Sequence, residues 1–299
     1  MSDPREVSRE EAEPLWAVED QAARLAELTS QEEDIKEAPL RRDVRSLGRL
    51  LGEVLKEQSG LGLFDAVEEL RRLAIRHREL STDQPAALPD AGDERELMEA
   101  AQRLVQDATA AEAHALTKAF SIYFELTNLA ETNHRKRRRR AVQLAPDLPP
   151  QPGSLRSTLR RMRAAGFTAD DALDSLRRVE VVPVFTAHPT EVARRTVLFK
   201  RRRIAEHLEA LDRLPLTTSE ATEREAAIAA EITALWQTDE VRRKQPTVSD
   251  EIQMGLDYYE ATLVTSLPRV YAEMADAFRE CYDVDLPARE LPTVVRFGS

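Results

Sequence analysis

Apolar residues recur at helical spacing along most of the chain before residue 179. The spacing predicts helices over residues 43–60, from about 63, over 94–107, from 112 to about 138, over 154–165 and over 168–178. A loosely ordered amino-terminal segment with one short helix near Leu25 and Leu28 is expected before them. In the helix over 43–60 the apolar positions lie three, four and seven apart: Val44, Leu47, Leu50, Leu51, Val54 and Leu55. Pro and Gly residues at 81–93 and 146–153 predict loops between these helices.

The pattern changes at Val179. Residues 181–185 are a short β-branched and aromatic run, typical of a buried strand, and a tight loop and a helix over 192–211 follow. Further helices are expected over 222–236 and 250–282, and a second strand over 293–297.

These elements predict a mostly α chain in two parts. Residues 1–178 form a helical region, and residues 179–299 hold strands near 180–187 and 293–297 with a helical excursion between them. Such strands can pair in parallel across a long crossover. Two strands alone make a poor sheet, and residues 298–299 add no polar tail. We therefore expect an incomplete chain.

The amino-acid composition limits the classes of protein to which the chain can belong. Hydrophobic residues make up 42% of the chain and aromatic residues 5%, and the net charge of −11 opposes general nucleic-acid binding. The single cysteine, Cys281, excludes an intrachain disulfide and a zinc site built on several cysteines. We expect a cytoplasmic protein, because the first 20 residues do not resemble a secretory signal and no apolar run is long enough for a membrane helix.

Residues 134–140 form the strongest charge run, His-Arg-Lys-Arg-Arg-Arg-Arg. Such a run can be a nuclear import signal or a nucleic-acid patch. It also continues an amphipathic helix and places cations near the carboxyl end of that helix, where the helix dipole favours them. We interpret it as a structural or oligomer-contact feature, and its own role stays open.

His188 is the candidate catalytic residue. It follows the first expected strand, and α/β folds assemble active sites at the carboxyl ends of strands. An imidazole there can act as a general acid or base near neutral pH. A turn histidine that hydrogen-bonds a neighbouring carbonyl group is an equally good interpretation from the spacing alone.

Arginines near this loop are candidates for binding an anion. Arg194 and Arg195 lie near the start of the helix that follows, where forked guanidinium donors and the helix dipole act together. A second pair, Arg242 and Arg243, lies on a later loop. For residues 200–203, Lys-Arg-Arg-Arg, a solvated basic helix face is an equally good interpretation.

Other catalytic and nucleotide-binding motifs are absent from the sequence. The five histidines show no spacing typical of metal ligands, and neither a GxxxxGK[ST] nor a GxGxxG motif is present. The GxSxG motif of many hydrolases is also absent.

Several longer segments together resemble the phosphoenolpyruvate carboxylase family. Residues 185–191, Phe-Thr-Ala-His-Pro-Thr-Glu, with the arginine pair that follows, resemble the family's first active-site signature. Residues 235–251 are similar to a second family segment, and residues 40–52 and 128–131 are similar to two of its helices. The resemblance extends from about residue 40 to the end.

The resemblance implies an enzyme, a carbon–carbon lyase that adds bicarbonate to phosphoenolpyruvate and forms oxaloacetate and phosphate. Such carbon dioxide fixation replenishes the tricarboxylic acid cycle. The family uses Mg²⁺ or Mn²⁺, is allosteric and tetrameric, and folds as a (β/α)₈ TIM barrel with many extra helices. By resemblance His188 assists proton transfer around carboxyphosphate, and Arg194, Arg195, Arg242 and Arg243 bind an anionic effector at a subunit contact.

The sequence departs from the family pattern at its carboxyl end. Residues 297–299 match only the start of the family's glycine-rich signature. By resemblance, the chain is the N-terminal part of the barrel with its first two strands, an inactive fragment whose metal ligands lie beyond residue 299. The alternative is a non-catalytic helical binding or anion-sensing protein derived from the same family, with no nucleic-acid or membrane partner in either case.

Overall fold

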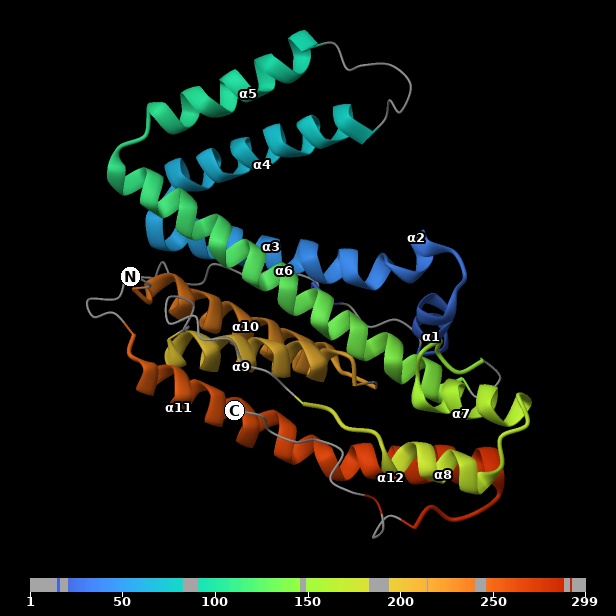
Figure 1. Ribbon diagram of the computed structural model, residues 1–299. Coiled ribbons are helices and arrows are strands. Elements are labelled where there is room, and N and C mark those ends of the chain that lie inside the picture. The colour runs from blue at the N-terminus through green and yellow to red at the C-terminus, as the bar shows by residue number, and fades with distance from the viewer. Residues whose placement is uncertain are drawn as a thin grey trace, which may run out of the picture. The chain divides into compact units, whose positions relative to one another are not determined.

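The computed structural model describes residues 15–16, 21–82, 91–145, 149–182, 194–213, 215–239, 246–287 and 291 (Figure 1). The regular elements of these residues are helices: α1 (Gln21–Thr29), α2 (Glu33–Lys36), α3 (Ala38–Ser59), α4 (Leu61–Thr82), α5 (Ala91–Gln106), α6 (Ala110–Leu144), α7 (Leu155–Ala164), α8 (Ala169–Arg177), α9 (Arg195–Leu211), α10 (Thr218–Gln237), α11 (Val248–Tyr258), the π-helix η2 (Tyr259–Val264) and α12 (Thr265–Tyr282). The expectation of a mostly α chain is confirmed.

The boundaries of several helices differ from the expected ones for local reasons. Helix α10 begins before residue 222, because Thr217 and Glu220 form a capping box that satisfies the first N–H groups. Helix α6 continues through the whole basic run to Leu144. The expected helix over 250–282 contains the π-helical turn η2, which ends at Val264. Pro268, four residues later, lacks the N–H group that would bond to the Val264 carbonyl oxygen.

The two expected barrel strands are not found among the described residues. Of the strand near 180–187, only residues 180–182 are described, and there Val181 makes an isolated bridge rather than a strand. A strand is stable only beside neighbouring strands, and no strand occurs in the described part of the chain to pair with it. Residues 183–187 and the strand over 293–297 lie outside the described residues. The barrel is therefore not confirmed.

The helices group into two compact units that are each discontinuous in sequence. Unit 1 comprises Met1–Ala141 and Arg194–Glu240, and unit 2 comprises Val142–Ala193 and Val241–Ser299. The division at residue 178 follows the change of sequence pattern, and as a domain boundary it stays a prediction. None of the described helices has the length and hydropathy to span a lipid bilayer.

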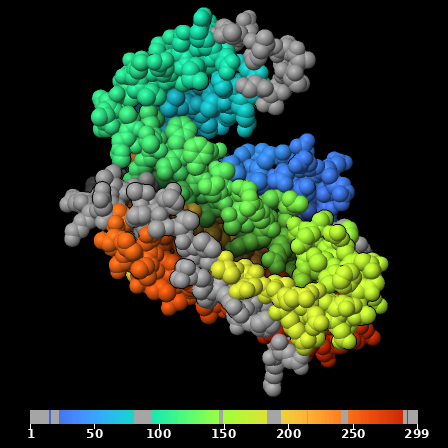
Figure 2. Space-filling model, in the orientation of Figure 1, coloured from blue at the N-terminus to red at the C-terminus, as the bar shows by residue number. Residues whose placement is uncertain are grey.

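Unit 1 has one core, to which helices from both of its segments contribute. Helix α3 packs against α4 and α10, and α9 packs against α10 (Figure 1). Leu47 of α3, Ile122 of α6 and Ile228 of α10 are buried in the same apolar cluster. Gly52 allows α3 and α4 to approach closely, because a Cβ atom there would lie 3.0 Å from the ring of Phe64. The side chains of α6 form a band across one face of this unit (Figure 2).

Unit 2 is built on contacts between α7, α8 and α12. Its core joins Leu159 of α7, Leu176 of α8 and Phe278 of α12, all of them buried. Ser154 caps α7, and a capping box between Thr168 and the third residue of α8 starts that helix as expected. Helix α11 contributes no buried residue.

Candidate functional site

Two of the candidate site residues are described, and both lie at the start of α9. Arg194 is the residue that precedes the helix, with an extended backbone, and its carbonyl oxygen accepts a hydrogen bond from Leu198 N–H. Arg195 is the first helical residue. His188, Arg242 and Arg243 lie outside the described residues, so their roles stay predictions.

The basic residues 200–203 of α9 are held by acidic partners within unit 1. Lys200 Nζ lies 2.8 Å from Glu231 Oε2, and Arg203 Nε donates to the same carboxylate. Arg201 Nε lies 2.9 Å from Glu125 Oε2 on α6. These ion pairs fix α9 against α6 and α10, so a structural role accounts for this face of the helix.

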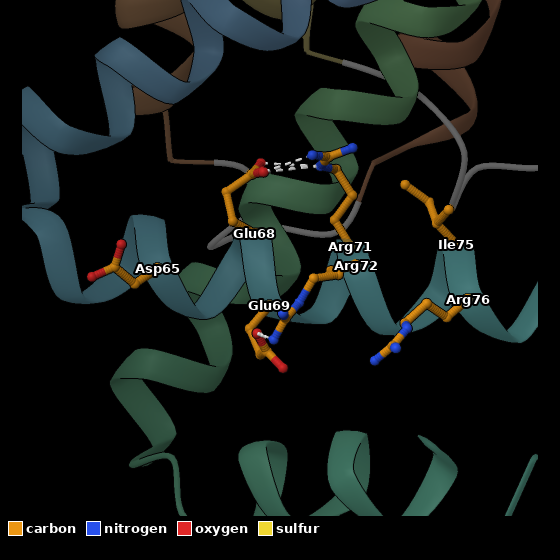
Figure 3. A pocket seen from close by; sticks show the side chains of 7 residues that line it. All are labelled: Asp65, Glu68, Glu69, Arg71, Arg72, Ile75 and Arg76. Carbon is orange, nitrogen blue, oxygen red and sulfur yellow. Dashed lines mark hydrogen bonds and ion pairs between the residues drawn. The ribbon is translucent and has the colours of Figure 1, made fainter. Parts of the chain in front are cut away.

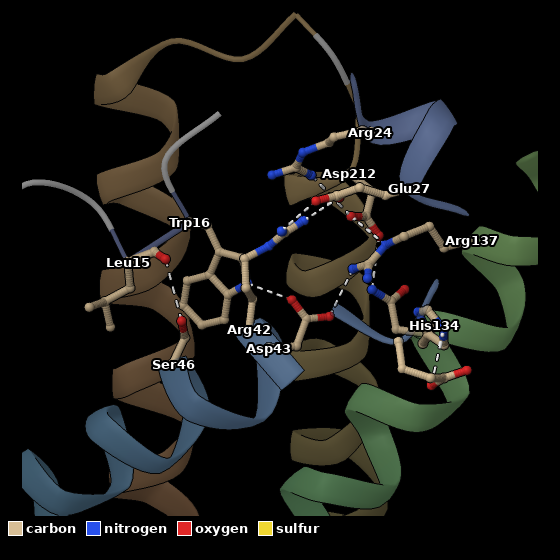
Figure 4. A network of polar contacts seen from close by, with 12 residues as sticks. Leu15, Trp16, Arg24, Glu27, Arg42, Asp43, Ser46, His134, Arg137 and Asp212 are labelled. Carbon is tan, nitrogen blue, oxygen red and sulfur yellow. Dashed lines mark hydrogen bonds and ion pairs between the residues drawn. The ribbon is translucent and has the colours of Figure 1, made fainter. Parts of the chain in front are cut away.

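A buried charge network surrounds Arg137, a residue of the basic run on α6 (Figure 4). Arg137 Nη2 donates to Asp43 Oδ2 of α3 at 2.8 Å, and Arg137 Nε donates to Asp212 Oδ1, just after α9, at 2.9 Å. The Arg137 side chain is 9% exposed and that of Asp43 is 3% exposed. Burial lowers the pKa of Arg137, but the two carboxylates outweigh it and raise that pKa above its ordinary value.

Trp16 connects this network to the amino-terminal segment. Its indole Nε1 donates to Asp43 Oδ1 at 2.9 Å, and its backbone N–H donates to Glu225 Oε1 of α10 at 3.0 Å. The Ser46 hydroxyl of α3 donates to the Leu15 carbonyl oxygen at 3.4 Å. The segment is therefore bound to both α3 and α10.

Three further residues of the basic run form ion pairs on the surface of unit 1. Arg135 pairs with Glu131, Lys136 Nζ lies 3.4 Å from Glu209 Oε2, and Arg138 Nη1 lies 3.7 Å from Glu37 Oε1. Together with the Arg137 network, these contacts favour the structural interpretation of residues 134–140.

His134 is the buried histidine of this run, with 3% of its side chain exposed. Its Nε2 lies 3.5 Å from Glu37 Oε2, and neither ring nitrogen has a hydrogen-bond partner among the described residues. Burial lowers the pKa of His134, and the charges of Arg137 and Arg138 act in the same direction against those of Glu37 and Asp43. The lowered pKa disfavours the charged form of the ring in the folded chain.

A separate hollow of about 460 Å³ lies along α4 (Figure 3). Four of the charged side chains that line it pair with one another one turn apart, Glu68 with Arg71 at 2.7 Å and Glu69 with Arg72. Exposed pairs of this kind stabilise a helix surface weakly. Among the residues that the structure describes, no group of three or more His, Cys, Asp or Glu side chains is placed to hold a metal ion.

Comparisons with known proteins bear on residues 40–299, which match the family model described as phosphoenolpyruvate carboxylase. The chain is 36% identical over 265 residues to phosphoenolpyruvate carboxylase of Azorhizobium caulinodans, a match that covers 88% of this chain and 27% of that protein. It is 37% identical over 265 residues to the enzyme of Paraburkholderia xenovorans, covering 88% and 25%. The chain spans about a quarter of the length of these relatives.

We expect Arg137→Met to destabilise unit 1 by about 3–5 kcal/mol, because it leaves Asp43 and Asp212 buried without their shared cation. Arg140→Met, in the same run of the same helix, is the control, because Arg140 is exposed and is expected to change stability by less than about 0.5 kcal/mol. Urea denaturation followed by circular dichroism measures both. Equal losses of stability in the two variants would contradict a stabilising role of the buried network.

We expect the chain to lose stability as the pH falls below about 6.5, the ordinary pKa of histidine. Because burial lowers the pKa of His134 in the folded state, the unfolded chain takes up the proton first, and protonation then favours unfolding. The loss grows until the pH reaches the lowered pKa of the folded state. Urea midpoints measured between pH 7.5 and 5 should fall less for His134→Gln than for the unchanged chain.

The pKa of His207 is also lowered, first by burial and then by Arg224 and Arg203, so a smaller pH dependence remains in His134→Gln. The matched control is His114→Gln, at an exposed position of α6, which should keep the full pH dependence. If the urea midpoint of His134→Gln shows the full pH dependence as well, His134 is not the group that causes this dependence.

Proposed function

The chain belongs to the phosphoenolpyruvate carboxylase family, and on this basis we propose that it is part of an enzyme that adds bicarbonate to phosphoenolpyruvate, forming oxaloacetate and phosphate. The observation that supports this most is the match of residues 40–299 to the family, together with relatives of that name. Because the chain spans about a quarter of those relatives, the proposed activity is that of a longer protein, and the 299 residues alone are expected to be inactive.

We propose that His188 moves a proton during this reaction. The reaction passes a carboxyl group from carboxyphosphate to the enolate, and an imidazole that titrates near neutral pH can take up and return a proton at the carboxyl group. His188 lies on the segment that leads into α9. Lys200 and Arg203 form ion pairs with Glu231 of α10, which fix α9 within unit 1.

We propose further that Arg194 and Arg195, with Arg242 and Arg243, bind an anionic effector at a subunit contact. The first N–H groups of a helix have no acceptor within the helix, and the helix dipole favours an anion at this end. The side chain of Arg194, the residue that precedes the helix, makes no capping hydrogen bond to α9. The start of α9 therefore differs from that of α10, whose first N–H groups Thr217 satisfies.

The remaining properties follow from the family and are part of the same proposal. A divalent cation, Mg²⁺ or Mn²⁺, would polarise the enolate oxygen of the substrate. No described residues form a group suited to hold it, so none is assigned as a ligand. We also propose a homotetrameric, allosteric, cytoplasmic enzyme whose oxaloacetate replenishes the tricarboxylic acid cycle.

In the full-length protein, His188→Asn is expected to lower oxaloacetate formation by at least about 100-fold, because general acid–base groups contribute about 10²–10⁴-fold and Asn cannot exchange a proton near neutral pH. A coupled assay with saturating bicarbonate measures the rate. His114→Asn, at an exposed position, should keep it. Near-normal turnover of a folded His188→Asn protein would contradict the proposed role.

Replacing both Arg194 and Arg195 with Ala in the full-length protein is expected to weaken the response to anionic effectors by about tenfold or more and to leave the basal rate nearly unchanged. The reason is that one charge-assisted hydrogen bond contributes about 1.5–3 kcal/mol. Rates are measured against a panel of sugar phosphates and dicarboxylates, with Arg202→Ala on the same helix as control, since Arg202 pairs with Glu206. A lost basal rate with an unchanged effector response would place the pair in the catalytic site.

A further inference from the structure

A small cavity lies beside the charge network of unit 1 that Figure 4 shows, and Trp16 is part of its lining. Its volume is about 30 Å³, enough for a single water molecule or a small ion. The described residues that line it are Leu15, Trp16, Arg24, Pro39, Arg42, Asp43 and Arg137. Three of these seven side chains are guanidinium groups, which donate hydrogen bonds and cannot accept them.

The carboxylate oxygens of the network are already used as acceptors. Asp43 Oδ1 accepts from the Trp16 indole and Asp43 Oδ2 from Arg137. Asp212 Oδ1 accepts from Arg137, and its Oδ2 accepts from Asn133 at 2.9 Å. These two carboxylates are the ones that Arg137 shares, and each of their four oxygens accepts one hydrogen bond.

The carboxylate of Glu27 also accepts hydrogen bonds through both of its oxygens. Glu27 binds Arg42 through two parallel hydrogen bonds, of 2.9 Å to Oε1 and 2.7 Å to Oε2. This bidentate pair is the strongest arrangement that a guanidinium group and a carboxylate can form. Glu27 is therefore committed to Arg42 rather than to the other two arginines.

Donors remain that have no such acceptor. Arg137 Nη1 has no hydrogen-bond partner among the described residues, and more than nine-tenths of the Arg137 side chain is buried. Arg24 forms an ion pair with Asp212 Oδ1, and at 3.6 Å it is longer than a hydrogen bond. A buried donor without an acceptor is destabilising, so the cavity favours an occupant that accepts hydrogen bonds.

Charge distinguishes an anion from a neutral acceptor. The three carboxylates match the three arginines in number, but the carboxylate of Asp212 is 3.6 Å from Arg24 and is shared with Arg137. Burial lowers the pKa of Arg24 most; the attraction of Asp212 opposes this effect, and repulsion from Arg137 and Arg42 adds to it. An anion between the two guanidinium groups would relieve that repulsion, whereas a water molecule would leave it in place.

We propose that this cavity is a binding site for one monovalent anion of halide size, held by Arg24 and Arg137. The site is independent of the proposed carboxylase chemistry. Its occupant would link α1 and α6 through hydrogen bonds that the protein groups alone do not make.

The first test compares thermal unfolding of the 299-residue chain in sodium chloride and in sodium gluconate at one fixed ionic strength. Gluconate is too large for a cavity of about 30 Å³. Replacing gluconate by chloride should raise Tm by about 2–4 °C, and the rise should saturate with chloride concentration, as expected for one site. Sodium bromide should act similarly. Equal Tm values in chloride and gluconate would overturn the proposal in favour of a water molecule.

Two variants test whether the chloride-dependent rise of Tm comes from this cavity. Arg24→Gln should abolish the chloride-dependent rise, whereas Arg71→Gln, which removes an exposed arginine of α4 in the same unit, should keep it. A chloride response that persists in folded Arg24→Gln would place the ion elsewhere and contradict the proposal.

A second measurement does not depend on the folding of any variant. Crystals of the unchanged chain grown in sodium bromide should show an anomalous peak at the bromine absorption edge within hydrogen-bond distance of Arg24 and Arg137. An ordered occupant at that position without an anomalous signal would be a water molecule, and it would overturn the assignment.

Discussion

The ion pairs of Arg137 are the interaction on which the arrangement of unit 1 depends. One guanidinium group joins α3 through Asp43 to the end of α9 through Asp212, and it does so from inside the protein. Buried charges are tolerated only when they are paired and hydrogen-bonded, so these three side chains have to form together. Apolar packing brings the helices into contact, while this network admits one relative position of α3, α6 and α9.

Much of the helical fold could be predicted because apolar periodicity and caps are local signals. The helix expected over 168–178 matches α8 and its cap Thr168, whereas the start of α10 was missed although Thr217 and Glu220 have the spacing of a capping box. The apolar periodicity of residues 250–282 did not indicate the π-helical turn η2, which ends four residues before Pro268. The barrel strands depend on partners distant in sequence, which local patterns do not supply.

The contacts of the candidate site could likewise not be predicted from local sequence patterns. A run of basic residues predicts a charged helix end, but it does not reveal that Arg137 is buried while its neighbours are more exposed. One signal was available: Asp43 lies four residues before Leu47, on the apolar face of α3, where a carboxylate requires a partner. His188 was identified from a motif, and its role stays a prediction.

The discontinuity of unit 1 has a consequence for the synthesis of the chain. Arg137 and Asp212 are 75 residues apart in sequence, and Trp16 and Glu225 are 209 apart. At roughly 5–20 residues per second, a ribosome needs about 4–15 s to extend the chain from Arg137 to Asp212. During this interval α3 and α6 present apolar surface that α9 and α10 later cover. The nascent helices therefore need protection from aggregation, for example by a chaperone, until α10 emerges.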